Sequence, residues 1–139
     1  MNEAFLDTNI LLRHLRADDP VLSPKATAII QAIEEGKLRA RTSDLVVFEA
    51  VYTLNRSYRV PKDKIAENLL SLLQLPGILL PKKRCYHKVF AIYVGQNIAF
   101  ADAFHAVLME ELGIKQVLSF DHEFDRLPGI TRLESPPAE

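Results

Sequence analysis

Short apolar stretches alternate with longer helical segments along this chain, and this alternation limits the folds open to it. The stretches predicted to be strands cover residues 4–6, 38–42, 78–80, 117–120 and 130–133. Between them, apolar residues recur every three or four positions, as in helices that bury one face. Short apolar strands separated by helices are typical of a parallel sheet with helices on both faces. The sequence therefore predicts an α/β fold in three layers, with a short, mostly parallel sheet flanked by helices.

The predicted helices have recognisable ends. Ser23-Pro24 offers an N-cap hydroxyl and a proline in the first turn, and Gly36 is a C-terminal stop. Six helices are predicted, over residues 10–15, 23–35, 44–58, 61–75, 86–94 and 101–112. A chain of 139 residues is long enough for one ordinary domain. We expect that domain to cover residues 1–134, followed by a frayed tail at residues 135–139.

Composition excludes several classes of protein. The 17 Lys and Arg against 18 Asp and Glu give a net charge of −1, which is no general signature of nucleic-acid binding. One cysteine excludes an internal disulfide and fits the reducing cytoplasm. The first residues lack the basic character of a secretory signal, and the apolar stretches are too short to span a membrane. We therefore expect a cytoplasmic protein.

Two acids follow predicted strands, and two lie on predicted helices. Asp7 and Asp121 come directly after apolar stretches, where parallel sheets bind ligands. Glu49 is the only residue among positions 45–54 that is charged at neutral pH, so burial there would require a metal or a basic partner. Asp102 lies in the first turn of a helix, where it could simply stabilise the helix dipole. Asp7 and Asp121 could likewise be turn or cap residues.

Taken together, the four acids predict a site for a hard cation. Clustered carboxylates without Cys or His at ligand spacing suit Mg²⁺, with Mn²⁺ as a substitute, rather than Zn²⁺. Such a site suits hydrolysis of a phosphodiester, in which a metal lowers the pKa of the attacking water. Asp7, Glu49, Asp102 and Asp121 are thus the predicted metal ligands and catalytic residues. Asp125 lies one turn beyond Asp121 and could replace it.

At these acids the chain resembles the PIN-domain family, and within it the VapC toxins of toxin–antitoxin pairs. The resemblance rests on the segments FLDTNILLR (5–13), VFEAV (47–51), FADAFHA (100–106) and VLSFD (117–121). It implies a PIN-like fold and a magnesium-dependent endoribonuclease that hydrolyses RNA. It also implies a homodimer and a small cognate antitoxin as partner. In that family the positions of Asn9 and Ser119 help to arrange the acids.

Basic residues supply candidate RNA contacts. Arg13 and Arg16 follow Asp7, and Lys82, Lys83 and Arg84 form a basic run. Such a run is more often a solvated helix start than a binding site.

Two other classes of function are weighed against the nuclease. One is a catalytically silent module that binds RNA or a protein. The other is an aspartyl-phosphate phosphatase or receiver domain. A phosphatase of that kind would place a second Asp where Asn9 stands, and a receiver would place an acidic pair earlier than Asp18-Asp19.

Overall fold

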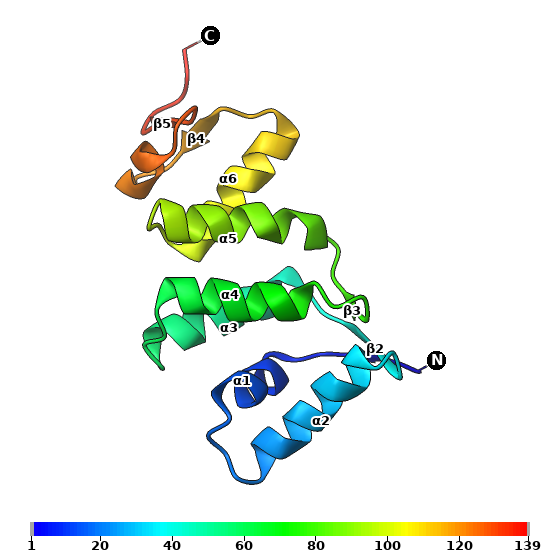
Figure 1. Cartoon of the computed structure of the whole chain (residues 1–139). Coiled ribbons are helices and arrows are strands. Elements are labelled where there is room, and N and C mark those ends of the chain that lie inside the picture. Colours follow the sequence, from blue (N-terminus) through cyan, green and yellow to red (C-terminus); the bar gives the residue numbers. More distant parts are fainter. Residues whose placement is uncertain (1, 139) are drawn as a thin grey trace. The chain divides into compact units, whose positions relative to one another are not determined.

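The computed structural model describes residues 2–138, which form two compact units divided between Arg84 and Cys85. The predicted α/β class is confirmed, because helices and short parallel strands make up both units. The strands form two sheets, one of three strands in the first unit and one of two in the second (Figure 1). Glu139, the last residue of the expected frayed tail, lies outside the described residues.

The first unit contains a parallel sheet in the order β1-β2-β3 and four helices. Its strands are β1 (Asn2–Phe5), β2 (Leu38–Arg41) and β3 (Ile78–Leu79). Its helices are α1 (Thr8–Arg16), α2 (Leu22–Glu34), α3 (Asp44–Arg56) and α4 (Lys62–Leu73). Helix α1 packs against α2 and α3, α2 also contacts β2, and α3 contacts α4.

Close packing in this unit depends on one glycine. A Cβ atom at Gly77 would lie 2.8 Å from Cγ2 of Ile33 and 3.2 Å from the Leu38 carbonyl oxygen. Gly77 therefore allows the segment before β3 to approach both α2 and β2.

The second unit contains two parallel strands, β4 (Gln116–Leu118) and β5 (Thr131–Leu133). Its helices α5 (Tyr86–Gly95) and α6 (Phe100–Leu112) pack against each other. Two 3₁₀ turns also occur in the chain, η1 (Lys83–Cys85) and η2 (His122–Arg126). The rings of Tyr86, Phe90, Tyr93 and Phe100 form an aromatic core beneath α5 and α6, with the Phe90 and Phe100 centroids 5.1 Å apart.

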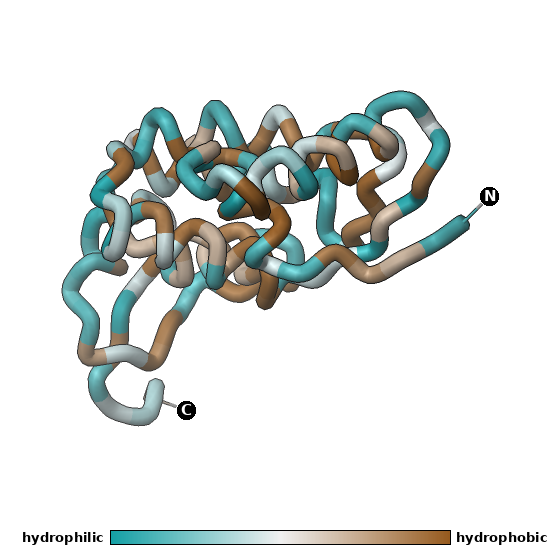
Figure 2. The backbone as a smooth tube through the Cα atoms, turned by 90° about the horizontal axis from the view of Figure 1, so that it is seen from below, coloured by the Kyte–Doolittle hydropathy of each residue, from teal (hydrophilic) through white to brown (hydrophobic). Residues whose placement is uncertain are grey.

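The hydropathy pattern produces these helices. Figure 2 shows hydrophobic and hydrophilic residues alternating along the helical coils. In α4 the apolar residues Ile65, Leu69, Leu72 and Leu73, which recur every three or four positions, are all buried. Within residues 2–138, no helix is both long enough and apolar enough to cross a membrane.

Three local predictions were wrong. Residues 4–6 were expected to be a buried strand, yet β1 is an edge strand with all its residues exposed, and only the next residue, Leu6, is buried. Helix α2 begins at Leu22 rather than at Ser23, because the Asp19 carboxylate accepts the backbone N–H groups of Val21 and Leu22. Strand β4 ends at Leu118, before Phe120, which is 78% exposed.

Candidate metal centre

The carboxyl ends of β1 and β2 position two of the predicted acids within the first unit. The buried Thr42 hydroxyl donates to the Leu6 carbonyl at 3.0 Å, and the Leu6 N–H donates to the Arg41 carbonyl at 2.7 Å. These bonds hold the turns after β1 and β2 side by side. Asp7 is the N-cap residue of α1, without a side-chain cap bond, and it is exposed together with Asn9. Ser43 caps α3, the helix that carries Glu49, by accepting the N–H of Val46.

Glu49 is exposed, which corrects the prediction that it lies in an apolar environment. Helix α3 buries Val46, Val47, Ala50, Val51 and Leu54 on one face. Glu49 lies on the opposite face, between Leu45 and Tyr52, which are 75% and 62% exposed. The apolar stripe of this helix is wider than the face it buries, so the sequence overstated the burial of Glu49.

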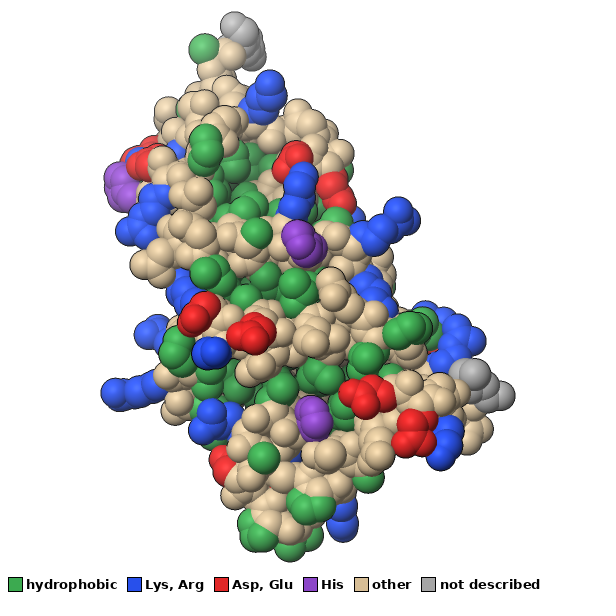
Figure 3. Space-filling model, in the orientation of Figure 1, with side chains coloured by type: hydrophobic (Ala, Val, Ile, Leu, Met, Phe, Trp, Pro, Cys, Tyr) green, Lys and Arg blue, Asp and Glu red, His purple; other side chains and the backbone are tan. Residues whose placement is uncertain are grey.

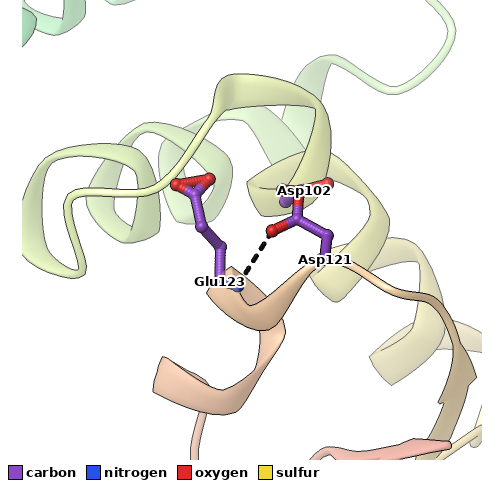
Figure 4. Close-up of side chains that lie close together, drawn as sticks. All are labelled: Asp102, Asp121 and Glu123. Atoms are coloured by element: carbon purple, nitrogen blue, oxygen red, sulfur yellow. Dashed lines mark hydrogen bonds between the residues drawn. The ribbon is translucent and has the colours of Figure 1, made fainter. Parts of the chain in front are cut away.

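The second unit brings three acids together. Asp102 lies in the first turn of α6, while Asp121 and Glu123 come from the segment after β4. One carboxylate oxygen from each acid lies within 4.8 Å of the others (Figure 4). Oxygen ligands bind Mg²⁺ and Ca²⁺ at about 2.0 to 2.6 Å, so two ligands of one ion lie up to about 4 to 5 Å apart. The three acids therefore fit a single hard cation after small side-chain adjustments.

Hydrogen bonds shape the segment that carries two of these acids. The Ser119 hydroxyl accepts the N–H of Asp121 at 3.0 Å. Oδ1 of Asp121 accepts the N–H of Glu123 at 2.9 Å, the bond drawn in Figure 4. Glu123 in turn accepts the N–H of Ala99, the N-cap residue of α6. These bonds connect the segment after β4 with the start of the helix that holds Asp102.

The surroundings of Asp102 disfavour the negative charge of its carboxylate. Its Oδ2 atom is buried and has no hydrogen-bond partner within residues 2–138. Burial, the neighbouring Asp121 and the charge of Glu123 raise the pKa of Asp102 to about 6. A cation would satisfy the buried oxygen and remove the repulsion, so the donor set fits a divalent metal.

Asp125 belongs to a different set of contacts. It accepts from Nε of Arg132 at 3.0 Å and faces the His122 ring at 3.2 Å. The hydrogen bond from Arg132 lowers the pKa of Asp125. The structure thus brings Asp121 beside Asp102 and engages Asp125 elsewhere. The sequence reasoning missed Glu123, although its position two residues after Asp121 was a usable signal.

Most of the candidate RNA-binding residues interact with other residues. Arg13 lies 3.8 Å from Asp18 and 3.9 Å from Asp19, and the Arg16 guanidinium stacks 4.8 Å from the Tyr58 ring centroid. Lys83 donates to the carbonyls of Leu75 and Ile78, and burial lowers its pKa. Lys82 is partly exposed and has a partner, and Arg84 is exposed. Figure 3 shows basic and acidic side chains interspersed on one face, without a single basic patch.

Comparison with known proteins identifies the family of the chain. A sequence model of the PIN domain family matches residues 4–130. The chain belongs to the PIN domain family. It is also 26% identical over 125 residues to a VapC ribonuclease of Aquifex aeolicus (strain VF5), covering 88% of this chain and 90% of that protein. The resemblance expected from the sequence is confirmed, and all four predicted acids lie within the matched PIN domain.

Proposed function

We propose that this PIN-domain protein is a metal-dependent endoribonuclease, the toxin of a VapC-type toxin–antitoxin pair. The observation that carries the proposal is the partly buried Asp102 carboxylate, which has an unpartnered oxygen and lies in a cluster with Asp121 and Glu123. The similarity to a VapC ribonuclease supports RNA as the substrate class. The cognate antitoxin is proposed as partner on the resemblance to the VapC toxins.

Asp102, Asp121 and Glu123 would hold the ion, for which we propose Mg²⁺, with Mn²⁺ as a substitute. The chemistry that such an ion supplies is a lower pKa for an attacking water and neutralisation of charge on the scissile phosphate. Asp102 lies in the first turn of α6, so the helix holds this ligand in place. Hydrogen bonds within the Ser119–Glu123 segment hold Asp121 and Glu123. Asp7 and Glu49 stay predicted ligands, on the likeness of their segments to the family.

Cleavage of a defined RNA by the purified full-length chain tests this function. We expect activity with Mg²⁺ or Mn²⁺, none in EDTA, and products with a 5′-phosphate and a free 3′-hydroxyl. Asp102→Asn and Asp121→Asn should abolish cleavage. Glu110→Gln is the matched control, because Glu110 is an exposed acid on the same helix that pairs with Lys88.

Two results would contradict the proposal. Activity that persists in EDTA, or a 2′,3′-cyclic phosphate product, would exclude metal-assisted hydrolysis. Metal binding without any RNA cleavage would instead favour the silent binding module.

A further inference from the structure

Arg132 forms several hydrogen bonds beside the acidic cluster, and the proposed function gives it no role. It lies on β5, where it is paired in register with Val117 of β4. Its side chain is only 10% exposed, so its position is well constrained by packing. It extends past the end of β4 to the segment that carries Asp121 and Glu123.

The guanidinium of Arg132 contacts that segment at three points. Nη1 donates to the Ser119 carbonyl at 3.0 Å, Nη2 lies 3.0 Å from Nδ1 of His122, and Nε donates to the Asp125 carboxylate at 3.0 Å. A fourth bond, from Nη1 to Glu134 at 2.7 Å, links the guanidinium to the residue that follows β5. Of the contacted residues, Ser119 comes before Asp121, His122 lies between Asp121 and Glu123, and Asp125 comes after Glu123.

We propose that Arg132 is a positioning residue for the metal centre, holding the Ser119–Asp125 segment so that Asp121 and Glu123 face Asp102. This inference rests on the proposed function. A guanidinium suits the role because its planar fork can bond a carbonyl, a ring nitrogen and a carboxylate at once. A lysine ammonium in the same place is a point charge with a different geometry.

Loss of Arg132 should change metal affinity in opposite directions, depending on whether its charge or its positioning of the acids matters more. A cation close to the acids repels a metal ion, so losing it by electrostatics alone would tighten metal binding. If Arg132 positions the acids, its loss weakens metal binding, because the acids are no longer held together. Substitution of residues that orient metal ligands typically costs about 10- to 100-fold in metal affinity.

The experiment measures Mn²⁺ binding to the metal-free full-length chain by calorimetry and by the electron paramagnetic resonance signal of free Mn²⁺. We expect Arg132→Lys, which keeps the charge, and Arg132→Met, which removes it, both to weaken binding, by about tenfold or more for Arg132→Met. Arg126→Met is the matched control. It removes an arginine that follows the Ser119–Asp125 segment directly and donates to the Asn97 carbonyl instead, so metal binding should be unchanged or slightly tighter.

Each outcome decides a separate point. If the wild type binds Mn²⁺ and both Arg132 variants bind it equally well or more tightly, the positioning role of Arg132 is overturned and the metal centre stands. Absence of Mn²⁺ binding by the wild type overturns the metal centre, and the positioning role with it. If Arg132→Met does not fold, Arg132→Lys alone gives the answer, since an affinity loss at constant charge has no electrostatic explanation.

Discussion

At the scale of single residues, the metal-free protein is under electrostatic strain at Asp102. Its carboxylate is partly buried, and the acids nearest to it, Asp121 and Glu123, carry the same charge as it does. Deprotonation of Asp102 is therefore more costly in the folded protein than in the unfolded chain. The strain has a measurable signature in the dependence of stability on pH.

The first prediction concerns that dependence in EDTA. The pKa of Asp102 rises from 3.8 in the unfolded chain to about 6 in the folded protein. Its contribution to the free energy of unfolding is thus fully present below about pH 3.8 and is lost as pH rises through about 6. Relative to Asp102→Asn, the wild type should lose stability between pH 4 and pH 7 in urea denaturation. A difference between the two proteins that stays constant with pH would contradict the raised pKa.

The second prediction separates the two roles of Glu123. Glu123→Gln keeps an oxygen that can accept the N–H of Ala99 but removes the negative charge from the cluster. Thermal stability in EDTA should therefore be equal or higher, while Mn²⁺ affinity measured by calorimetry should fall. Glu110→Gln should change neither quantity. Unchanged Mn²⁺ affinity in Glu123→Gln would restrict Glu123 to capping α6.

At the scale of elements, α1, which follows β1, and α3, which follows β2, have different N-caps. The Ser43 hydroxyl accepts the Val46 N–H and so caps α3, whereas the Asp7 side chain makes no cap bond to α1. One N-cap thus contributes to stability. The other leaves its carboxylate available for chemistry.

The third prediction follows from this difference. Ser43→Ala should cost about 1 kcal/mol in the free energy of unfolding, because α3 loses its cap. Asp7→Asn should change the metal-free stability by less than about 0.5 kcal/mol, as surface substitutions usually do, and should abolish RNA cleavage. Urea denaturation and the cleavage assay measure the two quantities. A strongly destabilised Asp7→Asn protein would indicate that Asp7 is structural.

The elements themselves were largely predictable from the sequence, and the reasons for the misses are local. Periodic apolar residues located all six helices, since burial of one face gives a pattern that a single sequence displays. The same pattern could not separate the buried face of α3 from its exposed one, because Leu45 and Tyr52 are apolar on the exposed side. Whether Asp121 or Asp125 lies beside Asp102 depends on Arg132, which binds Asp125. The sequence does not show this contact, because it depends on the pairing of β4 with β5.

At the scale of the whole molecule, both units expose large apolar side chains. Phe5, Leu45 and Tyr52 in the first unit are each more than half exposed, as are Leu112, Leu118 and Phe120 in the second. Exposed apolar side chains can take part in binding another protein surface. The homodimer implied by the family resemblance, or the antitoxin partner that we propose, would cover such side chains.

The fourth prediction is a dimer in solution. Light scattering at micromolar concentration should give about twice the chain mass of 15.7 kDa. Dilution should not change that value within the micromolar range. A mass equal to that of one chain throughout this range would contradict the dimer.

The position of Arg132 near the end of the chain has a genetic consequence. All the predicted ligands, from Asp7 to Glu123, are encoded before the codon for Arg132. A nonsense or frameshift mutation between the codons for residues 126 and 131 would therefore produce a chain that keeps every predicted metal ligand but lacks β5 and Arg132. Such alleles should be recovered among cells that survive expression of the protein. A check of the predicted ligands alone would classify these alleles as intact.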